Sequence, residues 1–213
     1  MSQPHEFVVC GSTTLHVGKI LALRLDQVIM PGGREAKREV VEHIGSVVIL
    51  PVHDDGSVTM IEQYRHPLGH RIRELPAGLL DAPGEEPVMT AQRELLEEVG
   101  YTARDWSVLV DLVPSPGFSD ESQRVFLARG LTQVDRPSAT DEEADLEVVR
   151  LPLAEAVRQV LTGEIVNGPA VAGLLAAHAV LAGVTQPRPA DTPWPDRPTR
   201  FAARHSKYGH MDA

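Results

Sequence analysis

The chain has 213 residues, a formal net charge of −10 and a single cysteine, Cys10. This length suits one compact domain, or one domain with a smaller companion, and the acidic charge argues against a non-specific nucleic-acid binder. A single cysteine excludes an internal disulfide and fits a reducing compartment, so we expect a cytoplasmic protein. The N-terminus has no basic stretch followed by an apolar run, so we expect no secretory signal. The longest apolar stretch, Ala170–Val184, is interrupted by His178 and is too short for a comfortable membrane span, so we expect no membrane partner.

The N-terminal part of the chain is rich in short β-like runs. We expect strands at Phe7–Val9, Ile20–Val28 and Glu39–Ile44, with a strong turn signal at Pro31-Gly32-Gly33 between the last two. Residues 1–45 are therefore predicted to form a small antiparallel β subdomain.

Three more strands and a helix follow. Ser46–Val52 and Val58–Tyr64 are β-rich and flank an Asp-Gly pair, which is a hairpin signal. Ile72–Ala77 is predicted to be the next strand. Apolar residues recur at helical spacing over Val88–Val99, and Gly100 stands where a glycine commonly caps a helix C-terminus.

Strands again precede helices in the remainder of the chain. The predicted strands are Trp106–Val113, Val125–Ala128 and Leu146–Leu151, and the predicted helices are Leu153–Leu161 and Pro169–Leu181. Strands, one helix, more strands and then helices indicate an α+β fold rather than alternating βαβ units. The main domain is predicted over residues 46–184. The proline-rich tail, residues 185–213, is expected to be an extended or disordered arm.

Three glutamates on the predicted helix carry the strongest chemical signal. Glu94, Glu97 and Glu98 stand at positions i, i+3 and i+4, so they share one face, where like charges destabilise a helix. A hard divalent cation such as Mg²⁺ would explain this cluster, because its usual ligands are carboxylates, waters and substrate phosphates, and several carboxylates can hold more than one ion. The alternative is a solvated acidic face on which Arg93 pairs with Glu97.

The residues around this helix resemble the motif of the Nudix hydrolase family. That motif is Gly, five residues, Glu, seven residues, then Arg-Glu-aliphatic-x-Glu-Glu-x-Gly-aliphatic. Glu85 and Arg93 have the required seven residues between them, and R-E-L-L-E-E-V-G-Y runs from Arg93 to Tyr101. Two departures are six residues between Gly78 and Glu85, and an aromatic residue at Tyr101. The resemblance implies a Nudix α/β/α sandwich with a mixed sheet, preceded by the β subdomain, that hydrolyses a diphosphate bond.

The same resemblance implies a role for each motif residue. It makes Glu94, Glu97 and Glu98 metal ligands, joined by the carbonyl group of Ala77, and it gives Arg93 the task of orienting a glutamate. The implied cofactor is Mg²⁺, with Mn²⁺ as a possible substitute, in two or three ions.

Features outside the motif resemble the ADP-ribose pyrophosphatase branch of the family. Pro116, followed by Gly117, lies sixteen residues beyond Gly100, where a proline marks ADP-sugar hydrolases. Arg65 and Arg73 lie in a strand pair similar to the one before the motif in that branch, where the arginine matching Arg65 contacts the substrate. The resemblance therefore implies that Arg65, Arg73, Pro116 and Gly117 bind the substrate. The β-rich N-terminus is similar to a small domain that exchanges across a homodimer in the branch and helps to enclose adenine.

The catalytic base is expected in an acidic loop after the motif, as in that branch. Alignment of Asp145-Leu146 with the branch's strand start favours Glu142, with Glu143 as the alternative and Glu121 as a weaker candidate.

The resemblance therefore implies hydrolysis of ADP-ribose to AMP and ribose 5-phosphate. The expected partners are this small nucleotide diphosphate substrate and a second copy of the chain in a homodimer. Within the enzyme class, the alternatives are other nucleoside diphosphate sugars, dinucleotides such as NADH and damaged nucleoside triphosphates. A different class is a non-catalytic, nucleotide-sensing regulator. Such regulators often lose motif glutamates, and this chain keeps them.

Overall fold

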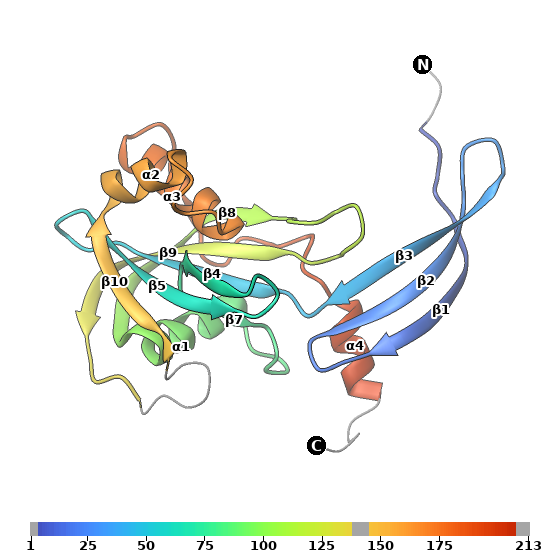
Figure 1. Cartoon of the computed structure of the whole chain (residues 1–213), viewed down its shortest axis with the longest axis horizontal. Coiled ribbons are helices and arrows are strands. Elements are labelled where there is room, and N and C mark those ends of the chain that lie inside the picture. Colours follow the sequence, from blue (N-terminus) through green and yellow to red (C-terminus); the bar gives the residue numbers. More distant parts are fainter. Residues whose placement is uncertain (1–3, 138–144, 208–213) are drawn as a thin grey trace. The chain divides into compact units, whose positions relative to one another are not determined.

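The computed structural model describes residues 4–137 and 145–207, with side chains up to residue 204. These residues form two compact units. The first contains residues 4–45, 113–122 and 196–207, and the second contains Ser46–Leu112 and Gln123–Pro195. Figure 1 labels the elements of both units.

The first unit is built on a three-stranded antiparallel sheet, with the order β1-β2-β3. Its strands are β1 (Val9–Val17), β2 (Leu21–Ile29) and β3 (Glu35–His43). Helix α4 (Arg200–Lys207) packs against β3, and its Phe201 side chain is fully buried. Residues 113–122 pair with the same strand, because Val41 donates its amide to the carbonyl oxygen of Phe118 and accepts from the amide of Asp120.

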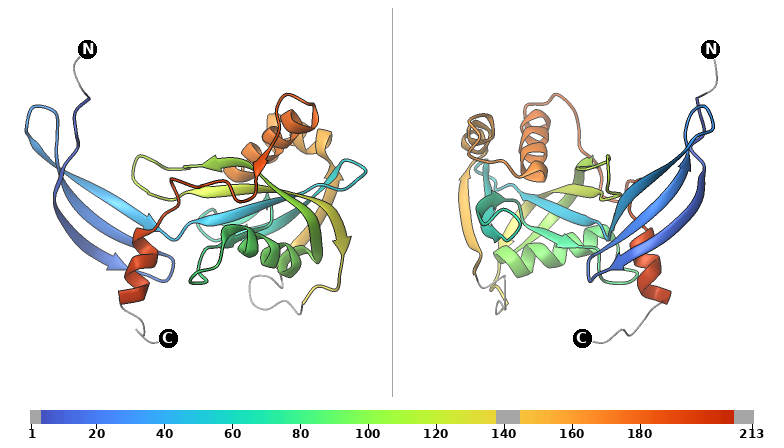
Figure 2. Two further views of the ribbon diagram at one scale, coloured as in Figure 1. Left: turned by 180° about the vertical axis from the view of Figure 1, so that it is seen from behind. Right: turned by 45° about the vertical axis from the view of Figure 1, so that its right-hand side comes forward.

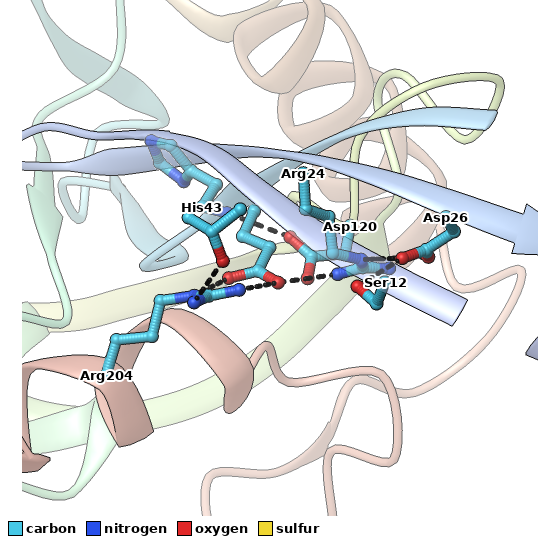
Figure 3. A network of polar contacts seen from close by, with 8 residues as sticks. Ser12, Arg24, Asp26, His43, Asp120 and Arg204 are labelled. Carbon is cyan, nitrogen blue, oxygen red and sulfur yellow. Dashed lines mark hydrogen bonds and ion pairs between the residues drawn. The ribbon is translucent and has the colours of Figure 1, made fainter. Parts of the chain in front are cut away.

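Between this sheet and α4 lies a group of ionic and hydrogen-bonded side chains that we call the paired network: Ser12, Arg24, Asp26, Glu42 and Arg204 (Figure 3). Arg24 donates through Nη1 to Glu42 at 2.7 Å and through Nε to Asp26 at 2.9 Å. Arg204 donates to both oxygens of Glu42, and Ser12 donates to Asp26. The hydrogen bond from Arg204, helped by Arg24, holds the pKa of the Glu42 carboxyl below its usual value although burial opposes it.

The second unit contains a five-stranded sheet, ordered β11-β8-β9-β4-β7, and a three-stranded sheet, ordered β10-β5-β6. The strands are β4 (Ser46–Pro51), β5 (Ser57–Arg65), β6 (His70–Glu74), β7 (Ala77–Leu79), β8 (Tyr101–Leu112), β9 (Gln123–Gln133), β10 (Glu147–Pro152) and β11 (Arg188–Pro189). Strands β4 and β9 are parallel, whereas the other pairs are antiparallel, so the sheet is mixed.

Helices cover both faces of these sheets (Figure 2). Strand β4 is buried along its whole length, and its alternating side chains divide the core: Val47 and Ile49 pack with α1 (Pro87–Val99), whereas Val48 and Leu50 pack with α2 (Leu153–Leu161) and α3 (Gly168–Leu181). The predicted α/β/α sandwich with a mixed sheet is confirmed. No helix of residues 4–137 and 145–207 is long and apolar enough to cross a membrane.

Strands β3, β8 and β9 begin earlier than predicted, and two further strand predictions differ more strongly from the structure. The first strand is Val9–Val17 rather than Phe7–Val9, because β1 is an edge strand whose side chains are mostly exposed and therefore show no clear alternation. The predicted strand Ile72–Ala77 is two strands, β6 and β7, divided around Pro76, which has no amide hydrogen to donate to a ladder.

The tail has more regular structure than the extended or disordered arm we expected. Strand β11 pairs with β8, and α4 follows it. Arg124, which is 2% exposed, donates to the carbonyl oxygens of Thr192 and Pro193 and lies 4.8 Å from the ring centre of Trp194. Residues 188–194 are therefore held against the five-stranded sheet.

Candidate active site

Helix α1 presents the predicted carboxylates because both of its ends and its apolar face are fixed. Pro87 begins the helix, where its missing amide hydrogen costs nothing. Gly100 ends it in the left-handed region, with φ of 70°. Ala91 and Leu95 are fully buried on the core side, so the glutamates lie on the remaining faces.

Arg93 lies among three of these carboxylates. Its Nη1 donates to Glu94 at 2.7 Å and to Glu97 at 2.9 Å, and its Nη2 lies 3.4 Å from Glu85. Thr90 also donates its hydroxyl to Glu85, at 2.8 Å. The predicted pairing of Arg93 with Glu97 is therefore present, but it is one part of a larger group.

Glu98 is oriented differently, towards the sheet. The residue is 7% exposed, and its carboxylate accepts a hydrogen bond of 2.9 Å from the backbone amide of Ala77, at the start of β7. This bond ties α1 to the strand whose carbonyl group at Ala77 we predicted to be a metal ligand. We call Glu85, Glu94, Glu97 and Glu98 the carboxylate cluster.

Gly78 is explained by the path of the Glu94 side chain. A Cβ atom at position 78 would lie 2.2 Å from the carboxyl group of Glu94, a distance that real Cβ atoms do not show. The glycine is thus a steric requirement. Burial raises the pKa of the Glu94 carboxyl to about 7, although Arg93 opposes this rise.

The carboxylate cluster fits a divalent cation by its chemistry. It supplies hard oxygen donors, and three of its carboxylates share a single arginine, Arg93. In the described part of the chain, no three His, Cys, Asp or Glu side chains are already arranged as a metal site. The reason is visible in the contacts: Glu94 and Glu97 turn towards Arg93, whereas Glu98 turns towards Ala77.

The two predicted substrate arginines lie on opposite faces of the β5–β6 ladder. Arg65 forms a double hydrogen bond with Glu74, on the face that packs towards α1. Arg73 donates instead to Gln159 of α2 at 2.6 Å, on the other face. Sequence analysis did not single out Glu74, because it is the register of β5 with β6 that brings its carboxylate to Arg65.

The remaining predicted site residues lie elsewhere. Pro116, Gly117 and Glu121 belong to the first unit, in residues 113–122 that pair with β3. Glu142 and Glu143 lie outside the described residues.

Comparison with known proteins decides which family this arrangement represents. A family model for the NUDIX domain matches residues 42–172. The chain belongs to the Nudix family. Gly78, Arg93 and the glutamates, whose sequence resembles the family motif with one additional residue in its loop, lie within the matched range.

Several relatives and a solved structure resemble this Nudix chain. The ADP-ribose pyrophosphatase of Mycobacterium tuberculosis is 59% identical over 203 residues, which cover 95% of this chain and 98% of the relative. The ADP-ribose pyrophosphatase of Bacillus subtilis is 42% identical over 148 residues, or 70% of this chain and 80% of the relative. A crystal structure described as an ADP compounds hydrolase has a TM-score of 0.74 at 22% identity and covers 86% of this chain and 98% of its own, which shows the shared fold.

Proposed function

We propose that this Nudix protein hydrolyses the diphosphate bond of ADP-ribose. Water attacks one phosphorus atom, a new phosphorus–oxygen bond forms, and the bond to the bridging oxygen breaks. The products are AMP and ribose 5-phosphate, and the proton of the attacking water passes to a carboxylate base.

The observation that carries the proposal is the carboxylate cluster beside Gly78. It occurs in a chain that is 59% identical to an ADP-ribose pyrophosphatase over 98% of the length of that relative. The cluster supports diphosphate chemistry because it holds excess negative charge close to one helix face. The extent of the match supports the substrate, because it includes the N-terminal and C-terminal segments outside residues 42–172.

The proposed cofactor is Mg²⁺, with Mn²⁺ as a substitute, in two or three ions. Glu94, Glu97 and Glu98, together with the carbonyl group of Ala77, are the groups that would hold them. When bound, these ions would neutralise charge on the diphosphate and lower the pKa of water.

The chain's own residues have separate tasks in this proposal. Arg93 keeps Glu94 and Glu97 in fixed orientations by donating to both of them. Arg65, rather than Arg73, holds the diphosphate through its guanidinium, because Arg65 lies on the ladder face that packs towards α1. Glu142 accepts the proton of water, with Glu143 as the alternative.

The first unit is proposed to enclose the substrate and to form a homodimer. Pro116 and Gly117 belong to this unit and are the proposed substrate contacts in it. Large exposed apolar side chains on edge strand β1 and beside it support association with a second copy: Phe7, Val8, Val9, Leu15, Val17 and Ile20. The single cysteine supports a cytoplasmic location.

Turnover of a substrate panel tests the proposal. The purified protein with Mg²⁺ is given ADP-ribose, a guanosine diphosphate sugar and NADH, and the products are separated by chromatography. We expect the highest kcat/KM for ADP-ribose, with AMP and ribose 5-phosphate formed in equal amounts. Turnover of another diphosphate without turnover of ADP-ribose would contradict the proposed substrate. Light scattering measures the molecular mass in solution and so tests the proposed homodimer.

A further inference from the structure

Arg65 forms a two-pronged ion pair with Glu74, a residue of the second unit to which the proposed mechanism gives no role. Nε of Arg65 donates to one carboxylate oxygen of Glu74 at 2.9 Å, and Nη2 donates to the other at 2.5 Å. This is the two-pronged geometry that fixes both the distance and the plane of a guanidinium. The fork engages two of the five N–H donors of an arginine.

Burial is strongly unequal within this pair. The side chain of Glu74 is 4% exposed, whereas that of Arg65 is 41% exposed. A carboxylate in such a buried place requires a partner, and Arg65 supplies it. The arrangement is therefore a buried anion that holds a half-exposed cation at the surface.

The backbone beside Glu74 is tied to the carboxylate cluster. Leu75 is 1% exposed, and the carbonyl oxygen of Pro76 accepts from the amide of Ile49 at 2.8 Å. One residue later, the amide of Ala77 donates to Glu98. Glu74 lies three residues from Ala77, a separation of at most about 11 Å along the chain, so one rigid segment connects the anchor of Arg65 with α1.

The neighbouring arginine shows that this placement is specific to Arg65. Arg73 is adjacent to Glu74 in β6, but it points to the opposite face, where it contacts Gln159 and Glu62. Strand alternation separates the two ion pairs, and the face that carries Arg65 is also the face on which Ile61 packs with α1.

We infer that Glu74 is a positioning residue: it holds the guanidinium of Arg65 in the orientation that binds a phosphate group of the substrate. This inference rests on the proposed function, because it needs Arg65 to contact the diphosphate. A long arginine side chain without this anchor would have to lose rotamer freedom when substrate binds, which weakens binding.

The test is steady-state kinetics on ADP-ribose with Mg²⁺ in a set of matched variants. Glu74→Gln keeps the shape of the side chain and removes its charge. We expect about a tenfold rise in KM and a change in kcat of no more than about threefold, because the effect is on binding. Glu62→Gln is the control, since it breaks the equivalent pair of Arg73, and it should leave KM unchanged.

Variants of Arg65 separate positioning from a purely structural role. Arg65→Lys keeps the charge but cannot form the fork, so we expect its KM to rise about tenfold as well. This variant therefore tests the inference even if Glu74→Gln does not fold. In an Arg65→Ala background, Glu74→Gln should change KM by less than about twofold, because there is no guanidinium left to position.

The outcomes also distinguish this inference from the proposed function. If Arg65→Ala raises KM but Arg65→Lys and Glu74→Gln do not, the positioning role is wrong and the proposed function stands. If Glu74→Gln raises KM equally with and without Arg65, its effect is not positioning and the inference is overturned. Absence of ADP-ribose turnover in the wild type would contradict the proposed function, and the inference with it.

Discussion

In the paired network of the first unit, two arginines pair with two carboxylates, whereas in the carboxylate cluster of the second unit one arginine, Arg93, is shared by Glu85, Glu94 and Glu97. Both groups are partly or wholly removed from water. Glu42 in the paired network is fully buried, yet its pKa is lowered, mainly by the hydrogen bond from Arg204. Glu94 in the carboxylate cluster is less deeply buried, yet burial raises its pKa to about 7.

We interpret this difference as a balance of charge that distinguishes a structural group from the proposed cation site. Where each anion has its own arginine, folding satisfies the charges and the group stabilises the unit. Where one arginine serves several anions, negative charge remains for a cation brought by the solvent or by the substrate. The predictions below test this distinction, from the largest expected effect to the smallest.

Neutralising a glutamate of the carboxylate cluster should have the largest effect, on turnover. Glu97→Gln and Glu98→Gln should each lower kcat on the order of a hundredfold or more, because each removes a proposed metal ligand. Glutamine at position 98 can still accept from the amide of Ala77, so the thermal unfolding temperature should stay near that of the wild type. Activity near wild type in both variants would refute the metal assignment.

Breaking the paired network should act on stability instead. Arg204→Ala leaves Glu42 with fewer donors and should lower the free energy of unfolding of the first unit by roughly 2–3 kcal/mol. Hydrogen exchange of amides in β2 and β3 measures this locally. The control is Arg38→Ala, which removes an exposed arginine of the same sheet and should change protection little. Equal effects of the two substitutions would mean that the paired network does not stabilise the first unit.

The two buried glutamates should give the stability of the metal-free protein opposite dependences on pH. The lowered pKa of Glu42 contributes stability above 4.5, its unfolded value, and this contribution is lost as pH falls below 4.5. The pKa of Glu94 is raised from 4.5 to about 7, so folding favours its protonated form. The contribution of protonated Glu94 to the free energy of unfolding, up to about 3 kcal/mol, is therefore lost as pH rises from 4.5 to 7.

Chemical unfolding of the wild type and two variants at several pH values tests these signs. Glu94→Gln should gain stability relative to the wild type between pH 4.5 and 7. At neutral pH, Glu42→Gln should have a lower free energy of unfolding than the wild type, and this difference should shrink as pH falls below 4.5. The same slope in both variants would contradict the proposed difference between the two groups.

Displacing one carboxylate without changing any charge should have the smallest effect. Gly78→Ala puts a Cβ atom where the Glu94 side chain lies, so Glu94 must move, and we expect kcat to fall about tenfold. Gly168→Ala is the matched control, because a Cβ atom there meets nothing within 4 Å. If the two variants had the same kcat, the position of Glu94 would not matter for the reaction.

Much of the active-site helix could be predicted because its signals are local. Apolar spacing and the glycine at position 100 gave the end of α1 correctly, and the i, i+3, i+4 spacing gave the shared location of three glutamates. The predicted bounds of α2, Leu153–Leu161, also match the structure, because its amphipathic pattern is strong.

Contacts between distant segments could not be predicted in the same way. Arg204 and Glu42 are 162 positions apart, and nothing in the charge of either residue indicates the other. The fork between Arg65 and Glu74 depends on which face of the ladder each side chain occupies, and therefore on the register of β5 with β6. The alternation that identifies a strand does not reveal this register.

Titration of the metal-free protein with Mn²⁺, followed by electron paramagnetic resonance, tests the central claim most directly. If the carboxylate cluster is the cation site, the wild type and Glu42→Gln should bind Mn²⁺ with the same affinity, whereas Glu97→Gln and Glu98→Gln should each bind at least about tenfold more weakly. Unchanged Mn²⁺ affinity in both Glu97→Gln and Glu98→Gln would contradict the account.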